Sequence, residues 1–235
     1  MKSDIETTEI HRPDTRVFLV RHGKSARHES PLYIGHPDVP LSDHGRHEAA
    51  KAGDKLVKKG AHPLRIYSSD LCRASETAEI IAERLGGIPI VLDKLFREMP
   101  MGDWDDELIM DIKAKFPEEY EKRGDDVRNY RVSGSENFYD LHPRVIREFH
   151  RIFAEDFRGP DSGEARQQDE DPGGADPGSS EDDPGDFIIV AHLGVITSLY
   201  EELFSEDEED GYWPHFKTGS VTTCEVPGWL WGRNA

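Results

Sequence analysis

The run from Val17 to Ser25 constrains the fold more than any other stretch of the sequence. It reads Val-Phe-Leu-Val-Arg-His-Gly-Lys-Ser, so four apolar residues are followed abruptly by Arg21, His22 and Gly23. A short apolar run bounded by polar residues predicts a strand that is buried on both faces of a parallel sheet. In open α/β sheets, ligands bind where strands end and turns lead away. A guanidinium beside an imidazole at such an edge indicates a site for an oxyanion.

The rest of the chain alternates predicted strands and helices. Further strands are expected over 64–67, 88–92, 187–191 and 220–226, the last of them at a sheet edge. Helices are expected over 43–59, 71–85, 107–116, 117–123, 138–157 and 195–204, and a long loop over 24–41. Strands that alternate with helices indicate a mainly parallel sheet flanked on both sides, which is the α/β fold class.

The length of 235 residues suits one sizeable domain. We expect a single domain over 1–235, with a flexible lead-in over 1–15 and an acidic insertion over 159–186. The insertion holds ten acids and one arginine among prolines, glycines and serines. Such a segment cannot bury a core, and its composition predicts disorder.

The charge and the composition argue against two kinds of binding partner, nucleic acids and membranes. The formal net charge is −19, of which −9 falls in 159–186 and −5 in 206–210, and no basic stripe remains for nucleic acid. No apolar stretch approaches the roughly 20 residues that span a bilayer, so we expect no membrane partner. The two cysteines, Cys72 and Cys224, lie far apart in the sequence, which favours a reduced, cytoplasmic protein. The oligomeric state is left open.

Two of the predicted strands end in a histidine, His22 and His192. Because parallel strands end at one edge of a sheet, we expect the two side chains to meet in one crevice. Two more strand-to-helix junctions supply Arg73 and Glu98. Arginine forks match the oxygens of a phosphate, and they repel a cation, so a metal site is disfavoured.

Five blocks of the sequence, in order, resemble the histidine phosphatase superfamily, also called phosphoglycerate mutase-like. They are Leu19-Val-Arg-His-Gly-Lys-Ser, Gly35-His-Pro-Asp-Val-Pro-Leu-Ser-Asp-His-Gly, Tyr67-Ser-Ser-Asp-Leu-Cys-Arg-Ala-Ser-Glu-Thr-Ala, Phe96-Arg-Glu with Gly102-Asp-Trp, and Val190-Ala-His-Leu-Gly-Val-Ile. The blocks cover about 17–104 and 187–204. The resemblance implies a three-layer α/β/α sandwich.

The resemblance also implies roles for individual residues. His22 would be the nucleophile that becomes phosphohistidine, while Arg21 and Arg73 clamp the phosphoryl oxygens. His192 would donate a hydrogen bond to the same group. Glu98 would be the general acid for the leaving group and then the base for water. The nearby Asp103, Asp105 and Asp106 are alternatives that could contribute to this role.

Ser25 would add one further hydrogen bond to the phosphoryl group. Two positions depart from the family pattern: His28 stands where many members have Asn, and Leu193 replaces the usual Gly after the second histidine. Whether His28 contacts phosphate is left open. His36, His44 and His47 are interpreted as loop and helix-surface residues. The resemblance implies that the reaction requires no metal and no organic cofactor.

The function implied is that of a phosphoric monoester hydrolase acting on a small phosphorylated metabolite, and the physiological substrate is left open. Gly102-Asp-Trp and the later Ser133-Gly-Ser-Glu-Asn-Phe are closest in style to α-ribazole phosphatase and broad-specificity phosphatases. Mutase-type phosphoryl transfer is the alternative, but the acidic run over 98–107 would repel a second phosphate. A non-catalytic phosphate-binding module is the other alternative.

Overall fold

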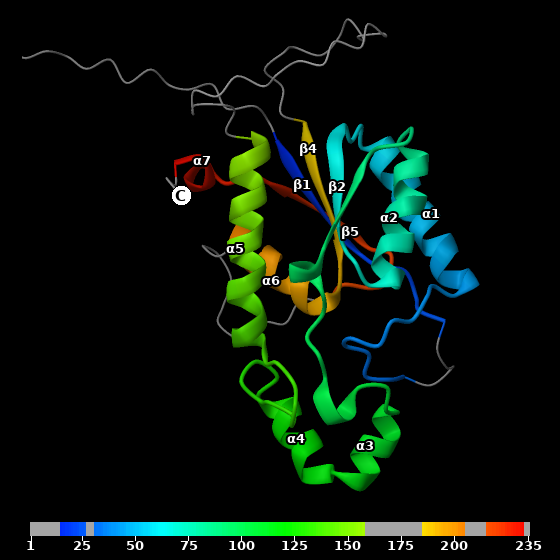
Figure 1. The fold of residues 1–235 in the computed structure, drawn as a ribbon, viewed down its shortest axis with the longest axis vertical. Coiled ribbons are helices and arrows are strands. Elements are labelled where there is room, and N and C mark those ends of the chain that lie inside the picture. The colour runs from blue at the N-terminus through cyan, green and yellow to red at the C-terminus, as the bar shows by residue number, and fades with distance from the viewer. Residues whose placement is uncertain (1–14, 27–30, 158–184, 205–214, 233–235) are drawn as a thin grey trace, which may run out of the picture.

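The computed structural model describes residues 15–26, 31–157, 185–204 and 215–232 (Figure 1). The strands are β1 (Arg16–Arg21), β2 (Pro63–Ser69), β3 (Ile90–Asp93), β4 (Asp186–Ala191) and β5 (Val221–Glu225). The α-helices are α1 (Asp43–Lys58), α2 (Cys72–Arg84), α3 (Ile109–Lys115), α4 (Pro117–Asp125), α5 (Phe138–Phe157), α6 (Leu193–Phe204) and α7 (Gly228–Gly232). Two short 3-10 helices, η1 (Lys94–Phe96) and η2 (Gly102–Trp104), lie between β3 and α3.

The five strands form one sheet in the order β3-β2-β4-β1-β5. All neighbouring pairs are parallel except β1 and β5, which run antiparallel at one edge. The predicted α/β class and the mainly parallel sheet are therefore confirmed. In the central pair, Arg21 of β1 lies in register with Ala191 of β4, so both strands end at the same level.

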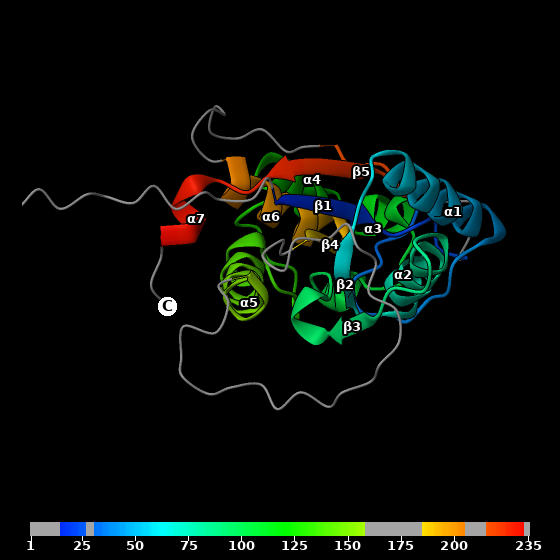
Figure 2. The ribbon, with the colours of Figure 1, turned by 90° about the horizontal axis from the view of Figure 1, so that it is seen from above.

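Helices cover both faces of this sheet, as the three-layer expectation required (Figure 2). A hydrophobic core lies on each face of the sheet. Each strand contributes side chains to both cores, since successive side chains point to opposite faces. Val17 and Leu19 of β1 pack with α5 and α6, whereas Phe18 and Val20 pack with α1 and α2. Because both faces of β1 are covered by helices, all four residues of the run 17–20 are apolar.

Residues 99–137, which we call the lid segment, lie beyond the ends of the strands and carry α3 and α4 (Figure 1). The lid segment has an apolar cluster of its own, separate from the two cores of the sheet. It consists of Met101, Trp104, Ile112 and Val132, with Tyr33, Tyr120 and Tyr130 packed against it. Tyr33 comes from the long loop after β1, so the lid segment is attached to that loop.

The predicted insertion needs one correction at its end. Residues 159–184 lie outside the described residues, but Asp186 is the first residue of β4 and only 1% exposed. Its carboxylate pairs with Arg16 at 2.7 Å, so the sheet begins one residue earlier than the composition indicated. Residues 1–14 of the expected lead-in also lie outside the described residues, and its last residue, Thr15, is buried. The single domain over 1–235 stays a prediction.

Candidate active site

His22 and His192 come together as the sequence predicted. Each follows the last residue of its strand, and the two strands are neighbours in the sheet. The backbone N–H of His22 donates to the carbonyl of Ala191 at 2.9 Å, and the ring centroids lie 5.0 Å apart. Both imidazoles are buried, with exposures of 8% and 0%. The edge of the sheet therefore holds two histidines in one enclosed site.

The hydrogen bonds of His22 determine its tautomer. Its Nδ1 lies 2.7 Å from the carbonyl oxygen of Gly23, which can only accept, so Nδ1 carries the proton. Burial, followed by the positive charges of Arg73 and Arg21, lowers the pKa of His22 to about 3. The ring is thus neutral at physiological pH, and its Nε2 carries an unshared electron pair.

His192 has a different set of partners. Its Nε2 lies 2.8 Å from the hydroxyl of Ser69, at the end of β2. Its Nδ1 is buried, and none of the residues that the structure describes gives it a hydrogen bond. Burial, helped by Arg73, holds the pKa of His192 well below its ordinary value. A buried nitrogen without a protein partner is costly unless a ligand supplies one.

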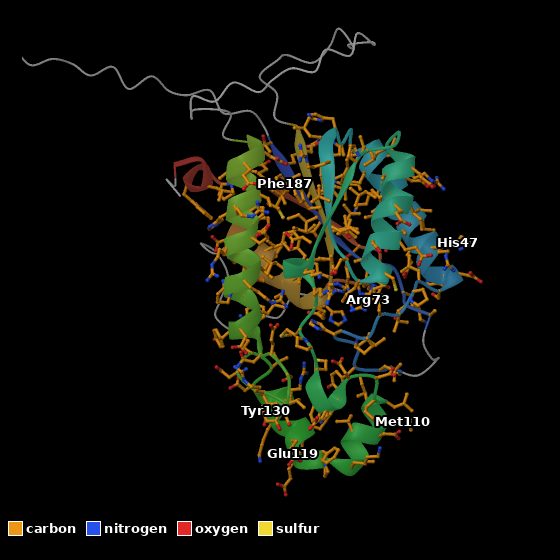
Figure 3. The ribbon with its side chains drawn as sticks, in the orientation of Figure 1. His47, Arg73, Met110, Glu119, Tyr130 and Phe187 are labelled. Carbon is orange, nitrogen blue, oxygen red and sulfur yellow. The ribbon has the colours of Figure 1, made fainter. Side chains whose placement is uncertain are left out.

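Two arginines flank the histidines. Arg73, at the start of α2, is only 1% exposed, and it donates to the carbonyls of Pro37 (3.0 Å) and Gly35 (2.7 Å). Figure 3 places it at the end of the sheet opposite Phe187, on the side of the lid segment. Arg21 donates to the carbonyl of Phe216, while its buried Nε has no partner among the described residues. Burial lowers the pKa of both guanidinium groups, and the charge of Glu98 opposes that shift.

Glu98 lies near enough to this cluster for its charge to act on both arginines. Its carboxylate accepts the backbone N–H of Met99 at 3.0 Å and that of Gly194 at 3.1 Å. A Cβ on Gly194 would lie 2.5 Å from Oε1 of Glu98, so only glycine leaves room for the carboxylate there. The first turn of α6, just after His192, therefore positions the carboxylate directly.

A second set of residues fixes these side chains, a role that sequence reasoning gave to none of them. Arg97 and Asp70 form a two-bonded ion pair, with both distances 2.6 Å, that joins the β2 end to the Glu98 segment. Asp105 accepts the N–H of Gly35 at 2.6 Å and that of Met101 at 2.9 Å. Ser69, Asp70 and Arg97 lie inside the sequence blocks quoted above, which was the available signal. Asp105 directly follows the Gly-Asp-Trp block, and the sequence indicated it only as an alternative to Glu98.

His36 is one of the three histidines that the sequence interpretation placed outside the site. It is an exposed loop residue, as expected, but its Nε2 donates to the backbone carbonyl of Glu98 at 2.9 Å. Its flanking residues, Gly35 and Pro37, are the two that hold Arg73. The other two histidines match the helix-surface expectation, since His44 pairs with Glu48 and His47 with the Asp43 carbonyl on α1.

The predicted roles of several other residues stay predictions. Ser25 is partly buried and forms an isolated bridge with Leu41, so its contact with phosphate stays a prediction. His28 lies outside the described residues. Leu193 is the first residue of α6 and packs partly against the core.

Within the described ranges, no group of three or more His, Cys, Asp and Glu side chains is arranged to hold a metal ion. None of the helices in those ranges has the length and apolar character needed to cross a membrane.

Comparison with known proteins assigns this arrangement to a family. A family model described as histidine phosphatase superfamily (branch 1) matches residues 17–159. A glucosyl-3-phosphoglycerate phosphatase of Mycolicibacterium vanbaalenii is 29% identical over 199 residues, which are 85% of this chain and 77% of the relative. Phosphoglycerate mutase-like protein 4 of Arabidopsis thaliana is 29% identical over 188 residues, 79% and 69% of the two chains.

Solved structures agree with this assignment. A mycobacterial glucosyl-3-phosphoglycerate phosphatase in complex with VO3 superposes with a TM-score of 0.70 and 26% identity, covering 89% of this chain and 90% of that one. The family model spans more than half of the 235 residues, and the parallel sheet delivers both histidines of the quoted blocks to one edge. The chain therefore belongs to the histidine phosphatase superfamily.

Proposed function

We propose that this protein is a phosphomonoesterase that needs no metal and works through a phosphohistidine on His22. The observation that carries the proposal is the state of the His22 ring. Nδ1 is committed to the Gly23 carbonyl, and the pKa of about 3 keeps the ring neutral, so Nε2 is a nucleophile at physiological pH.

In the first step, Nε2 of His22 attacks phosphorus and the bond to the leaving oxygen breaks. The charge on the three remaining oxygens is met by Arg73 and Arg21, whose guanidinium groups are held by backbone carbonyls. The buried Nε of Arg21 and Nδ1 of His192 lack partners among the described residues and are suited to bind these oxygens. For His192 to donate there, the Ser69 hydroxyl donates to its Nε2.

Glu98 moves the protons in both steps. Protonated, it gives its proton to the leaving oxygen, so an alcohol departs. As a carboxylate, it takes a proton from water while the water oxygen attacks phosphorus and the P–N bond to His22 breaks. Inorganic phosphate leaves, and both the neutral imidazole and the protonated Glu98 are restored. The two backbone N–H groups from Met99 and Gly194 hold the carboxyl group in place between the steps.

The relatives include phosphatases and a mutase-like protein, so mutase-type transfer is the competing activity. Hydrolysis is favoured because the segment that follows Glu98 carries Asp103, Asp105, Asp106 and Glu107. These acids would oppose a second phosphate group beside the first. A mutase would interconvert 2- and 3-phosphoglycerate after priming with a bisphosphate. This protein should instead release inorganic phosphate.

The test is hydrolysis of p-nitrophenyl phosphate with EDTA present, comparing the protein with its His22→Asn variant. We expect turnover in EDTA, loss of at least about a thousandfold in kcat for the variant, and an acid-labile phosphoenzyme in the unaltered protein. His47→Asn, on the exposed face of α1, is the matched control. Turnover that survives in His22→Asn, or that appears only when a metal is added, would refute the proposal.

A further inference from the structure

His36 joins two parts of the site. Its ring donates through Nε2 to the carbonyl of Glu98 at 2.9 Å, while its backbone lies between the two carbonyls that accept from Arg73. It is therefore attached both to the residue proposed to protonate the leaving group and to the arginine proposed to bind phosphate. Sequence reasoning gave it no such place.

The position of His36 relative to the reaction follows from these contacts. The leaving oxygen must face Glu98, because Glu98 gives it a proton. His36 is bound to the backbone of Glu98 and is exposed, whereas His192 is fully buried behind it. The rings are nonetheless close enough that charge on His36 lowers the pKa of His192. The exposed imidazole of His36 thus lies beside the backbone of Glu98, the residue proposed to protonate the leaving group.

The Nε2 bond also fixes what the ring presents to a ligand. A carbonyl oxygen only accepts, so the proton of a neutral His36 is on Nε2 and Nδ1 carries a lone pair. Within the part of the chain that the structure describes, Nδ1 has no hydrogen-bond partner. The group that satisfies it is a hydrogen-bond donor, such as a hydroxyl.

We infer that His36 determines specificity for the leaving group by accepting a hydrogen bond, through Nδ1, from a hydroxyl close to the phosphoester oxygen. This rests on the proposed function and deepens it. The preferred substrates are then phosphate monoesters of polyols or sugars rather than of simple alcohols. A leaving group without the hydroxyl still reacts, because Arg21, Arg73 and Glu98 do not depend on it.

Two substitutions separate the two nitrogens of the ring. The side-chain NH2 of His36→Gln reaches the position of Nε2 and keeps a donor for the Glu98 carbonyl, but it removes the acceptor at Nδ1. The side-chain oxygen of His36→Asn stands near the position of Nδ1 and keeps that acceptor, but it loses the donor. The substrates are glycerol 1-phosphate and 1-propyl phosphate, which differ in the hydroxyls of the leaving group. The measured quantity is the ratio of their kcat/KM values in each protein at pH 8, where imidazole is ordinarily neutral.

We expect the unaltered protein to prefer glycerol 1-phosphate. His36→Gln should lose about three- to tenfold of that preference, as removal of one neutral hydrogen bond would cause. His36→Asn should keep the preference. An unchanged ratio in His36→Gln, or an equal loss on both substrates in both variants, would show that His36 only positions Glu98 and would overturn the inference.

Failure of the proposed function is recognised separately with p-nitrophenyl phosphate, which has no hydroxyl on its leaving group. If its turnover depends on His22 while the glycerol-to-propyl ratio does not respond to His36→Gln, only the inference about His36 is wrong. If His22→Asn turns over all three substrates like the unaltered protein, the proposed function fails and the inference falls with it.

Discussion

At the scale of single residues, the contact between Gly194 and Glu98 is the tightest constraint on the proposed acid. The carboxylate accepts the N–H of Gly194, and there is no space for a Cβ at that position. The Glu98 carboxylate thus occupies space that is open only because residue 194 has no side chain. The preceding Leu193 departs from the family pattern, but it leaves this contact intact.

Gly194→Ala should displace the Glu98 carboxylate and slow protonation of the leaving group. We expect kcat for an alkyl phosphate to fall by at least about tenfold, and to fall much less for p-nitrophenyl phosphate, whose good leaving group needs little acid. Steady-state kinetics on both substrates checks this. Gly124→Ala is the control, because nothing lies within 4 Å of its Cβ position. Equal losses on both substrates would mean that the alanine disturbs phosphate binding instead.

At the scale of elements, the loop before α1 and the lid segment are joined through Asp105. One oxygen of its carboxylate accepts from Gly35 and the other from Met101. Gly35 in turn gives its carbonyl to Arg73. A residue of the lid segment therefore helps to position the guanidinium at the start of α2 that is proposed to bind phosphate.

Asp105→Asn should weaken phosphate binding, because an amide can accept only through one of its two terminal atoms. We expect the inhibition constant for inorganic phosphate to rise about fivefold or more, together with a lower Tm. Inhibition assays and thermal unfolding measure the two effects. Asp103→Asn, exposed in the same 3-10 turn, is the matched control. A lower Tm with an unchanged inhibition constant would limit Asp105 to a structural role.

At the scale of the whole molecule, folding buries two histidines that must stay neutral. For His22 the folded-state pKa is about 3, against about 6.5 for an unfolded chain. Between these values the unfolded state binds a proton that the folded state does not. The free energy of unfolding therefore falls as the pH drops from 6.5 toward 3, and rises in the opposite direction.

His22→Gln should remove that proton uptake. We expect the loss of unfolding free energy between pH 6.5 and pH 4.5 to be about 2 kcal/mol smaller in this variant than in the unaltered protein. Urea unfolding at both pH values measures the difference, whatever the variant's stability at either one. His47→Gln controls for the general loss of a histidine. An equal loss in the unaltered protein and in His22→Gln would contradict a neutral, buried His22.

Much of the fold could be predicted because its signals are local. A short stretch of sequence is enough to recognise the apolar runs that form β1 and β4 and the periodicity of α5. The limits of α5 agree with the prediction. The short helix α7 was missed, since five residues give too little periodicity to detect. The first residue of β4 was missed because Asp186 looks like part of the acidic run, and its burial is made tolerable by the ion pair with Arg16 and the hydrogen bond from the backbone N–H of His62.

The sequence by itself determined which residues could carry the chemistry, because strand ends and the quoted blocks mark His22, Arg73, Glu98 and His192 directly. The tertiary structure alone decided their states. The tautomer of His22, the partner of His192 and the place of His36 depend on carbonyls and hydroxyls from other strands and loops. Backbone groups are the same at every position of a sequence, so which of them meets which side chain is decided only when the chain has folded.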